Sequence, residues 1–222
     1  MFDRIAFRYD LMNRFLSAGI DVHWRKMAIR ELQSDHPALV LDVATGTADM
    51  PILMTKYLQT RQIIGVDISE GMLELGRKKI DRLKLTEKIE LRSADSEALP
   101  FAGETFDAVT VAFGVRNFEN LEQGLQEMRR VLKTGGKLII LEFSKPGHIG
   151  FKNLYNIYLR FIAPFLGKLL SKNKAAYQYL NESVRAFPEG NDLLRILEQV
   201  GYNGTYLKSL SAGICTIYCG NK

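Results

Sequence analysis

The chain has few of the residues that build metal centres or disulfide frameworks. It holds two cysteines, Cys215 and Cys219, and three histidines that all lie far from them in the sequence. This distribution argues against a zinc site and against a disulfide framework. The cysteines lie four residues apart on an expected strand, so they point to one face. We expect two buried, structural thiols in a reducing compartment.

Long apolar runs, internal repeats and low-complexity stretches are also missing. The longest candidate for a membrane span, residues 151–170, is interrupted by Lys152, Arg160, Pro164 and Lys168, so we expect it not to cross a membrane. The first residues show no basic and apolar leader pattern, so we expect no signal peptide. A length of 222 residues with 46% hydrophobic and 25% charged residues suits a single globular domain. We expect residues 1–36 to form a helical cap and residues 145–188 an inserted lid.

The net charge of +5 is concentrated in one segment. Residues 145–185 hold seven basic residues, one acidic residue and seven of the 22 aromatics, which leaves the rest of the chain near neutrality. Such a basic and aromatic segment suggests contact with a membrane surface or an acidic ligand. The alternative is a lid whose lysines are simply solvated. Nucleic acid is disfavoured, because no extended basic face accompanies the segment.

Apolar runs and helical periodicity alternate along the chain. A second N-terminal helix begins near Asp21, and further helices are expected from Ser69, around residues 121–132 and at residues 191–200. Strands are expected at residues 39–44, 62–67, 88–93, 106–113 and 136–143, and a terminal hairpin at 203–209 and 213–219. This order predicts an α/β, doubly wound, mostly parallel sheet with one antiparallel strand from the hairpin. It resembles the seven-stranded Rossmann-like fold of class I S-adenosylmethionine methyltransferases more than a dehydrogenase.

The first candidate binding motif, LDVATGTAD, occupies residues 41–49 between a strand and a helix. In an open α/β sheet, ligands bind beyond the carboxyl ends of the strands. Gly46 allows the backbone to approach a ligand closely. Asp42 is placed to pair with the amine of a methionine moiety, and the Thr47 hydroxyl and local N–H groups are placed to hold its carboxylate.

The second motif, GVDIS, ends the next strand, and its Asp67 follows Gly46 by 21 residues. A carboxylate at this place accepts hydrogen bonds from ribose hydroxyls in both NAD and S-adenosylmethionine proteins. The glycine pattern separates the two, because a pyrophosphate favours a G-x-G-x-x-G turn and this chain has alanines around a single glycine. An NAD oxidoreductase stays a weaker alternative.

The third motif, SADSEALPF, covers residues 93–101. Asp95 is placed to accept from an adenine amino group, and Ser96 to offer a backbone N–H to the ring. Asp107, at the start of the fourth strand, completes the series of carboxylates at strand ends. Together these motifs predict S-adenosylmethionine as the cofactor, with S-adenosylhomocysteine as its product and no metal.

Seven further segments carry a resemblance that spans essentially the whole chain. They are residues 1–13 (MFDRIAFRYDLMN), 16–19 (LSAG), 24–26 (WRK), 112–117 (AFGVRN), 130–133 (RVLK), 141–146 (LEFSKP) and 179–185 (YLNESVR). On these segments the chain resembles the menaquinone/ubiquinone-biosynthesis C-methyltransferases, often called UbiE/MenG. That family often has glycine where this chain has Ala48, which we expect to add a methyl near the ligand. The chain starts inside the N-terminal motif, so residues upstream of Met1 are also expected.

The resemblance implies methylation of a ring carbon on a polyprenylated quinol, converting demethylmenaquinol to menaquinol or acting on a ubiquinone precursor. Arg116 and Asn117 follow the fourth strand, where methyltransferase substrates usually meet the cofactor. We therefore expect Arg116 to stabilise the phenolate or to organise a water that takes the proton, Asn117 to orient the ring oxygen, and Tyr9 to cap the site and share proton transfer. The alternatives for Arg116 and Tyr9 are a surface ion pair and core packing. The resemblance also implies a homodimer and a cytoplasmic protein at the inner membrane face.

Two other functions are compatible with the cofactor motifs, and a third is disfavoured. A sterol-type or other small-molecule methyltransferase would share them, and a cofactor-binding scaffold in a quinone-biosynthesis assembly would keep them without turnover. A nucleic-acid methyltransferase usually has an N/D-P-P-Y/F motif after the fourth strand, where this chain has FGVRN.

Overall fold

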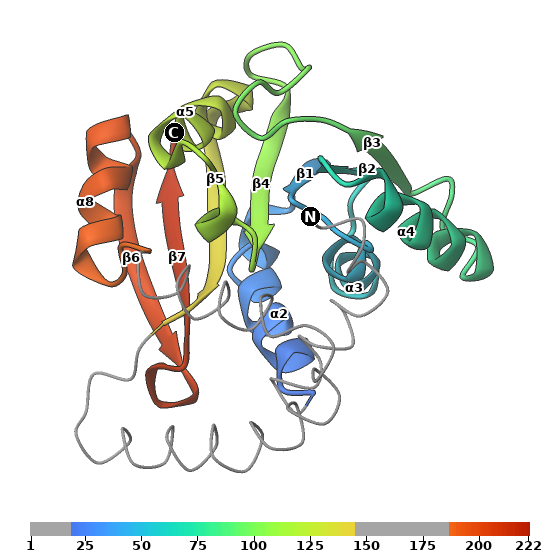
Figure 1. Cartoon of the computed structure of the whole chain (residues 1–222), viewed down its shortest axis with the longest axis horizontal. Coiled ribbons are helices and arrows are strands. Elements are labelled where there is room, and N and C mark those ends of the chain that lie inside the picture. Colours follow the sequence, from blue (N-terminus) through green and yellow to red (C-terminus); the bar gives the residue numbers. More distant parts are fainter. Residues whose placement is uncertain (1–18, 145–186) are drawn as a thin grey trace.

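The computed structural model describes residues 19–144 and 187–222, which form one seven-stranded sheet flanked by helices (Figure 1). The strand order is β3-β2-β1-β4-β5-β7-β6, running from right to left in the view of Figure 1. The strands are β1 (Leu39–Val43), β2 (Gln62–Asp67), β3 (Ile89–Ser93), β4 (Phe106–Ala112), β5 (Leu132–Phe143), β6 (Asn203–Leu210) and β7 (Cys215–Asn221).

The strand pairing confirms the expected sheet. Neighbours among β1 to β5 are parallel, and β7 is antiparallel to both β5 and β6. The chain proceeds outward from β1 to β3 on one side and from β4 to β5 on the other. The boundary between β1 and β4 is therefore a topological switch point, the place where open α/β sheets bind ligands.

Helices cover both faces of the sheet. The helices α2 (Asp21–Arg30), α3 (Asp49–Tyr57) and α4 (Glu70–Arg82) contribute to one hydrophobic cluster, and α5 (Leu121–Val131) and α8 (Asn191–Val200) to the other. Alternate residues of β1 follow this division, because Val40 lies in the first cluster while Leu41 and Val43 lie in the second. Burial on both faces explains the uninterrupted apolar runs of the central strands.

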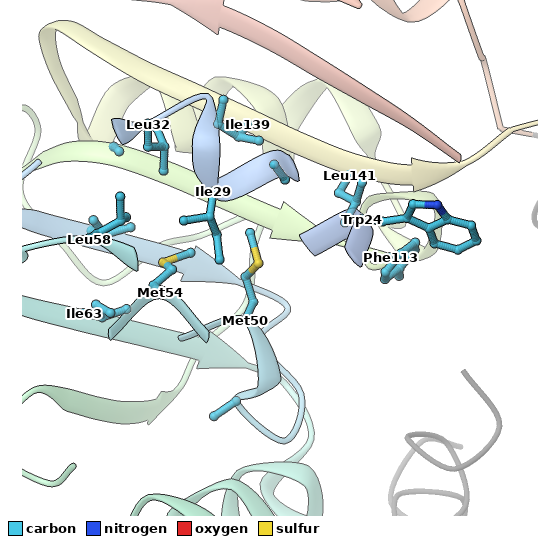
Figure 2. Close-up of a cluster of buried hydrophobic side chains, with 14 of the residues drawn as sticks. Trp24, Ile29, Leu32, Met50, Met54, Leu58, Ile63, Phe113, Ile139 and Leu141 are labelled. Atoms are coloured by element: carbon cyan, nitrogen blue, oxygen red, sulfur yellow. The ribbon is translucent and has the colours of Figure 1, made fainter. Parts of the chain in front are cut away.

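The helix α2 is anchored by large side chains. Figure 2 shows Ile29 of α2 near Met50 and Met54 of α3, with Trp24 beside Phe113 at one end of the cluster. Leu32, which follows the helix, belongs to the same cluster. The Trp24 indole N–H also donates to the Ser211 hydroxyl at 2.8 Å. The packing holds α2 at the carboxyl end of β4, where Phe113 lies.

Three expected boundaries were wrong. The fifth strand begins at Leu132 rather than 136, because Leu132 pairs with Phe106. The helix before it therefore ends at Val131, short of the two glycines. The last strand begins at Cys215, because a 3-10 turn, η4 (Ser211–Gly213), precedes it.

Both cysteines are free and buried, as the sequence predicted. Burial raises the pKa of the Cys219 thiol to about 11, so it is protonated at neutral pH. Within residues 19–144 and 187–222, no helix is long and apolar enough to cross a membrane, and no group of three or more His, Cys, Asp or Glu side chains is placed to hold a metal ion. Tyr9 and nearly all of the expected lid fall outside the described residues.

Candidate functional site

A cavity of about 540 Å³ opens at the carboxyl ends of β1, β2 and β4 and at the loop after β3. Its wall includes six of the predicted cofactor residues, Asp42, Gly46, Thr47, Asp67, Asp95 and Ser96, together with Asn117. The volume lies in the range of small-molecule and cofactor pockets. The structure therefore brings residues from four separate segments together at the switch point.

The turn between β1 and α3 has an unusual backbone. Ala44, Gly46 and Ala48 have φ angles of 52°, 56° and 65°. Left-handed conformations cost an alanine roughly 1–2 kcal/mol, and only packing offsets that cost. The Ala48 methyl is fully buried and faces Gly76 of α4, so the expectation that it lies near the ligand was wrong. Glycine at position 76 makes room for it.

Asp67 is held rigidly at the end of β2. Its Oδ2 accepts the Gly46 N–H at 2.8 Å, and its Oδ1 accepts the Ser69 N–H at 2.9 Å. Each carboxylate oxygen has more than one lone pair, so the pair of backbone bonds orients the group without exhausting it. Ser69 in turn caps α4 by accepting from Met72 N–H. This geometry suits a carboxylate that accepts hydrogen bonds from ribose hydroxyls.

The loop after β3 forms a second acceptor site. Asp95 Oδ1 accepts the Glu97 N–H at 2.9 Å. This hydrogen bond closes a local turn, which fixes the direction of the carboxylate. Glu97 Oε1 accepts the Asn120 N–H at 2.8 Å, which ties this loop to the start of α5. Asp95 and Ser96 therefore lie on a braced segment, as an adenine-binding loop requires.

Thr47 and Asp49 share a lysine. Lys79 Nζ of α4 lies 2.5 Å from Thr47 Oγ1 and 2.9 Å from Asp49 Oδ1. A hydroxyl that accepts from lysine keeps its own proton as a donor. Thr47 is thus oriented as a donor on the pocket wall, in line with its predicted part in holding a carboxylate.

Asp42 is the most deeply buried acid of the pocket. It is 1% exposed, and its Oδ1 accepts the Thr110 hydroxyl of β4 at 2.5 Å. Burial raises the pKa of Asp42 to about 6, and the hydroxyl and the nearby Arg25 charge limit the rise. A desolvated carboxylate is stabilised when a cation enters the pocket, because the cation replaces lost hydration.

The pocket is strongly acidic. Among the described residues on its wall, six are carboxylates and Arg25 is the one basic residue. The carboxylates are Asp42, Asp49, Asp67, Asp95, Glu97 and Glu119. A dinucleotide with a negatively charged pyrophosphate would be repelled, whereas a ligand with a sulfonium and an ammonium would be attracted. The residues therefore fit S-adenosylmethionine. The negative charge of the pocket argues against NAD more strongly than the glycine pattern of the sequence does.

The far side of the pocket is formed by the segment after β4. Phe113 has a φ of 61°, a strained conformation for a bulky residue. A Cβ on Gly114 would lie 2.5 Å from the Ala44 Cβ, so glycine is needed for the two loops to touch. Asn117, in η3 (Val115–Asn117), lines the cavity beside them. The cofactor turn and this segment form one continuous wall.

Arg116 lies behind that wall rather than on it. Its guanidinium bonds to Glu142 Oε1 at 2.5 Å and to the Phe113 carbonyl at 2.8 Å, and the two charged side chains are 2% and 0% exposed. Burial raises the pKa of Glu142, and the Arg116 charge opposes the rise. The alternative for Arg116 was a surface ion pair. The ion pair with Glu142 exists, but it is buried.

Asp107 does not belong to the site. Its Oδ2 accepts the Ala38 and Leu39 N–H groups at 3.0 and 2.8 Å, and its Oδ1 accepts from Lys133 at 2.6 Å. These contacts lie at the amino ends of β1 and β4, opposite the cavity. Including Asp107 in the series of strand-end carboxylates was wrong for that reason. Sequence reasoning also missed Arg25, whose place over the pocket depends on how α2 packs.

The fold and the charge of this pocket define an S-adenosylmethionine-dependent methyltransferase. The chain belongs to the ubiE/COQ5 methyltransferase family, whose model matches residues 1–222. It is 48% identical over 222 residues to a demethylmenaquinone methyltransferase from Bacteroides fragilis, covering 100% of this chain and 91% of the relative. It is 42% identical to the ubiquinone/menaquinone biosynthesis C-methyltransferase UbiE from Geotalea daltonii, with coverage of 100% and 94%.

Solved structures confirm the fold. A protein from Methanococcus maripaludis, whose crystal structure is described as that of an S-adenosylmethionine-dependent methyltransferase, superposes with a TM-score of 0.70 at 19% identity. The alignment covers 99% of this chain and 93% of the other. The solved structure confirms the expected class I fold, and the family model with the full-length relatives confirms the cofactor class and the enzyme class.

Proposed function

We propose that this enzyme methylates a ring carbon of a polyprenylated demethylmenaquinol to give menaquinol. The observation that carries the proposal is the continuous wall between the acidic cofactor pocket and the segment holding Phe113, Gly114 and Asn117. An aromatic acceptor lying on that segment meets the methyl end of the cofactor. Relatives that match the whole chain are named for demethylmenaquinone and for ubiquinone/menaquinone biosynthesis, which supports a quinol acceptor.

Methyl transfer requires the protein mainly to position the two reactants and to stabilise charge. Bound S-adenosylmethionine supplies a methyl group activated by its sulfonium. The side chains must align the ring carbon with that methyl, exclude water and stabilise the phenolate of the quinol. Asn117 on the cavity wall is proposed to donate an amide N–H to the ring oxygen, and Tyr9 is proposed to cap the site and share the proton transfer.

Arg116 keeps a proposed part in the reaction. Its bonds to Glu142 and to the Phe113 carbonyl favour a positioning part, because they hold the turn that carries Asn117. Its guanidinium is also proposed to stabilise the phenolate of the quinol by its charge. A guanidinium is a poor base, since its pKa exceeds about 12.

Replacing Asn117 with alanine should lower kcat by roughly tenfold to a hundredfold, because one hydrogen bond to developing charge is lost. The dissociation constant for S-adenosylmethionine should stay within about threefold of the unchanged protein. Steady-state kinetics and calorimetric titration measure the two quantities. Asn203→Ala, at an exposed position on β6, serves as the matched control. Equal losses of kcat and cofactor affinity would contradict the assignment of Asn117 to the acceptor.

The acceptor is tested by supplying short-tailed demethylmenaquinone in its reduced and oxidised forms. Only the quinol has a hydroxyl that ionises to a nucleophilic phenolate, so product should form from the reduced form alone. A demethylated benzoquinol precursor, run in parallel, tests the ubiquinone alternative that the family name also covers. Methylation of the benzoquinol but not the naphthoquinol would overturn the choice of substrate.

The enzyme is also proposed to act in the cytoplasm at a membrane surface, where the polyprenyl tail resides. The basic and aromatic composition of residues 145–185 supports this proposal. Sedimentation with vesicles containing anionic phosphatidylglycerol should carry the protein down at low salt and release it at high salt. Failure to bind such vesicles at low salt would remove the membrane contact. The proposed homodimer is tested by sedimentation velocity.

A further inference from the structure

Arg25 of α2 differs in charge from the rest of the described pocket wall. Six carboxylates and this single guanidinium line the cavity. The Arg25 side chain is 12% exposed, so its charge is largely shielded from bulk water. A buried cation on an acidic wall acts over short distances with little screening.

The Arg25 guanidinium has few partners of its own. Among the described residues its nearest carboxylate is Asp21, with Nε 3.9 Å from Oδ2, well beyond the roughly 2.7–2.9 Å of a charge-assisted hydrogen bond. Among the described residues, its buried Nε has no hydrogen-bond acceptor. The group lies over the Phe113 ring, 5.1 Å from the centroid. A guanidinium with five N–H donors is thus held in place with donor capacity for a planar anion.

The order of the binding residues sets the direction in which the cofactor lies. Asp67 and Asp95 follow β2 and β3, so the adenosine belongs on that side of the pocket. The methionine moiety must then extend toward β1 and β4, where Asp42 and Phe113 lie. Arg25 is on this side, because it contacts the Phe113 ring and its charge acts on Asp42.

The backbone of the cofactor turn offers few donors to a carboxylate. The Thr45 N–H donates to the Val66 carbonyl, the Gly46 N–H to Asp67 and the Ala48 N–H to the Thr45 carbonyl. A ligand carboxylate near these groups would face the acidic wall with the Thr47 hydroxyl as a neutral donor, which does not neutralise its charge. The guanidinium of α2 is the group suited to neutralise it.

We propose that Arg25 binds the carboxylate of the methionine moiety of S-adenosylmethionine, while Asp42 faces its ammonium group. The amino-acid end of the cofactor is then recognised as a zwitterion by two opposite charges, one from α2 and one from β1. The Phe113 ring under the guanidinium supports its orientation. This assignment depends on the cofactor and not on which quinol is methylated.

The test compares S-adenosylmethionine with decarboxylated S-adenosylmethionine on the unchanged protein and three variants. Dissociation constants are measured by calorimetry for the unchanged protein, for Arg25→Met, and for Arg25→Lys, which keeps a charge but not the planar fork. Lys26→Met is the matched control, since Lys26 is the next residue of α2 and lies over Tyr57 instead of the cavity. Circular dichroism verifies that each variant is folded.

The ratio of the two dissociation constants, decarboxylated over intact, should fall by about tenfold or more in Arg25→Met, because a hydrogen bond between charged groups is lost with one ligand only. Arg25→Lys should give an intermediate ratio, and Lys26→Met an unchanged one. An unchanged ratio in Arg25→Met would overturn the proposal. So would normal cofactor affinity combined with a selective rise in KM for the quinol, since Arg25 would then face the acceptor.

Discussion

Replacing Glu142 with leucine is expected to lower the free energy of unfolding by about 3–5 kcal/mol, the largest effect we predict for a single change. The reason is electrostatic. Arg116 would keep its charge in a site where its side chain is 2% exposed and where its ion-pair partner, Glu142, is gone. Urea denaturation at neutral pH, followed by circular dichroism, measures the difference.

Two further variants separate the charge from the shape of the site. The double variant Arg116→Met/Glu142→Leu removes both charges and should be more stable than Glu142→Leu alone, because no uncompensated ion remains. Asp192→Ala removes an exposed ion pair with Arg195, in which both side chains are at least 70% exposed. It should cost less than about 1 kcal/mol. A double variant less stable than Glu142→Leu would contradict this account of the buried pair.

The same variants report on Arg116 in the reaction. If Arg116 only positions the turn that carries Asn117, adding Asn117→Ala to the double variant should lower kcat little further, because the contact made by Asn117 is already lost. If the arginine charge itself stabilises the phenolate, adding Asn117→Ala should lower kcat of the double variant by the same factor as in the unchanged protein. Single-turnover kinetics with saturating cofactor distinguishes the two cases.

Replacing Asp42 with asparagine is expected to have opposite effects on stability and on cofactor binding. Burial raises the pKa of Asp42 from 3.8 to about 6 in the folded protein without ligand. The folded state therefore binds a proton more tightly than the unfolded state between these pH values, and stability falls as the pH rises through that window. The shift corresponds to roughly 3 kcal/mol at pH 8.

Asparagine cannot ionise, so Asp42→Asn should stabilise the ligand-free enzyme by up to about 3 kcal/mol at pH 8 and by little near pH 4. Its affinity for S-adenosylmethionine at pH 8 should fall by roughly tenfold to a hundredfold, because a charge-assisted contact with the ammonium is lost. For the unchanged protein, affinity should weaken as the pH drops below about 6. Thermal unfolding and calorimetry over this pH range measure both effects. Unchanged affinity in Asp42→Asn would contradict the role of Asp42.

The sequence predicted the sheet well for a physical reason. Central strands buried on both faces, such as β1 and β2, are short apolar runs, and the motif residues that follow them must meet at one edge. Asp42, Asp67 and Asp95 were found in this way. Strand ends depend on pairing, so the start of β5 at Leu132 required knowledge of its contact with Phe106.

Side-chain direction was harder to predict than position. Arg116 and Asn117 are neighbours in the sequence, yet one turns inward to Glu142 and the other lines the cavity. No periodicity distinguishes them in a three-residue 3-10 turn. Arg25 was missed because nothing in the sequence reports that Trp24 and Ile29 pack α2 against the sheet beside the pocket.

The central claim is that this pocket delivers a methyl group to the ring carbon of a demethylated naphthoquinol. The most direct test is a single reaction containing the enzyme, S-adenosylmethionine with a deuterated methyl group, and reduced short-tailed demethylmenaquinone. The account predicts a menaquinol whose ring carbon carries the intact deuterated methyl, seen by mass spectrometry with fragmentation. Label on a ring oxygen, or no labelled product from a protein that binds the cofactor, would contradict it.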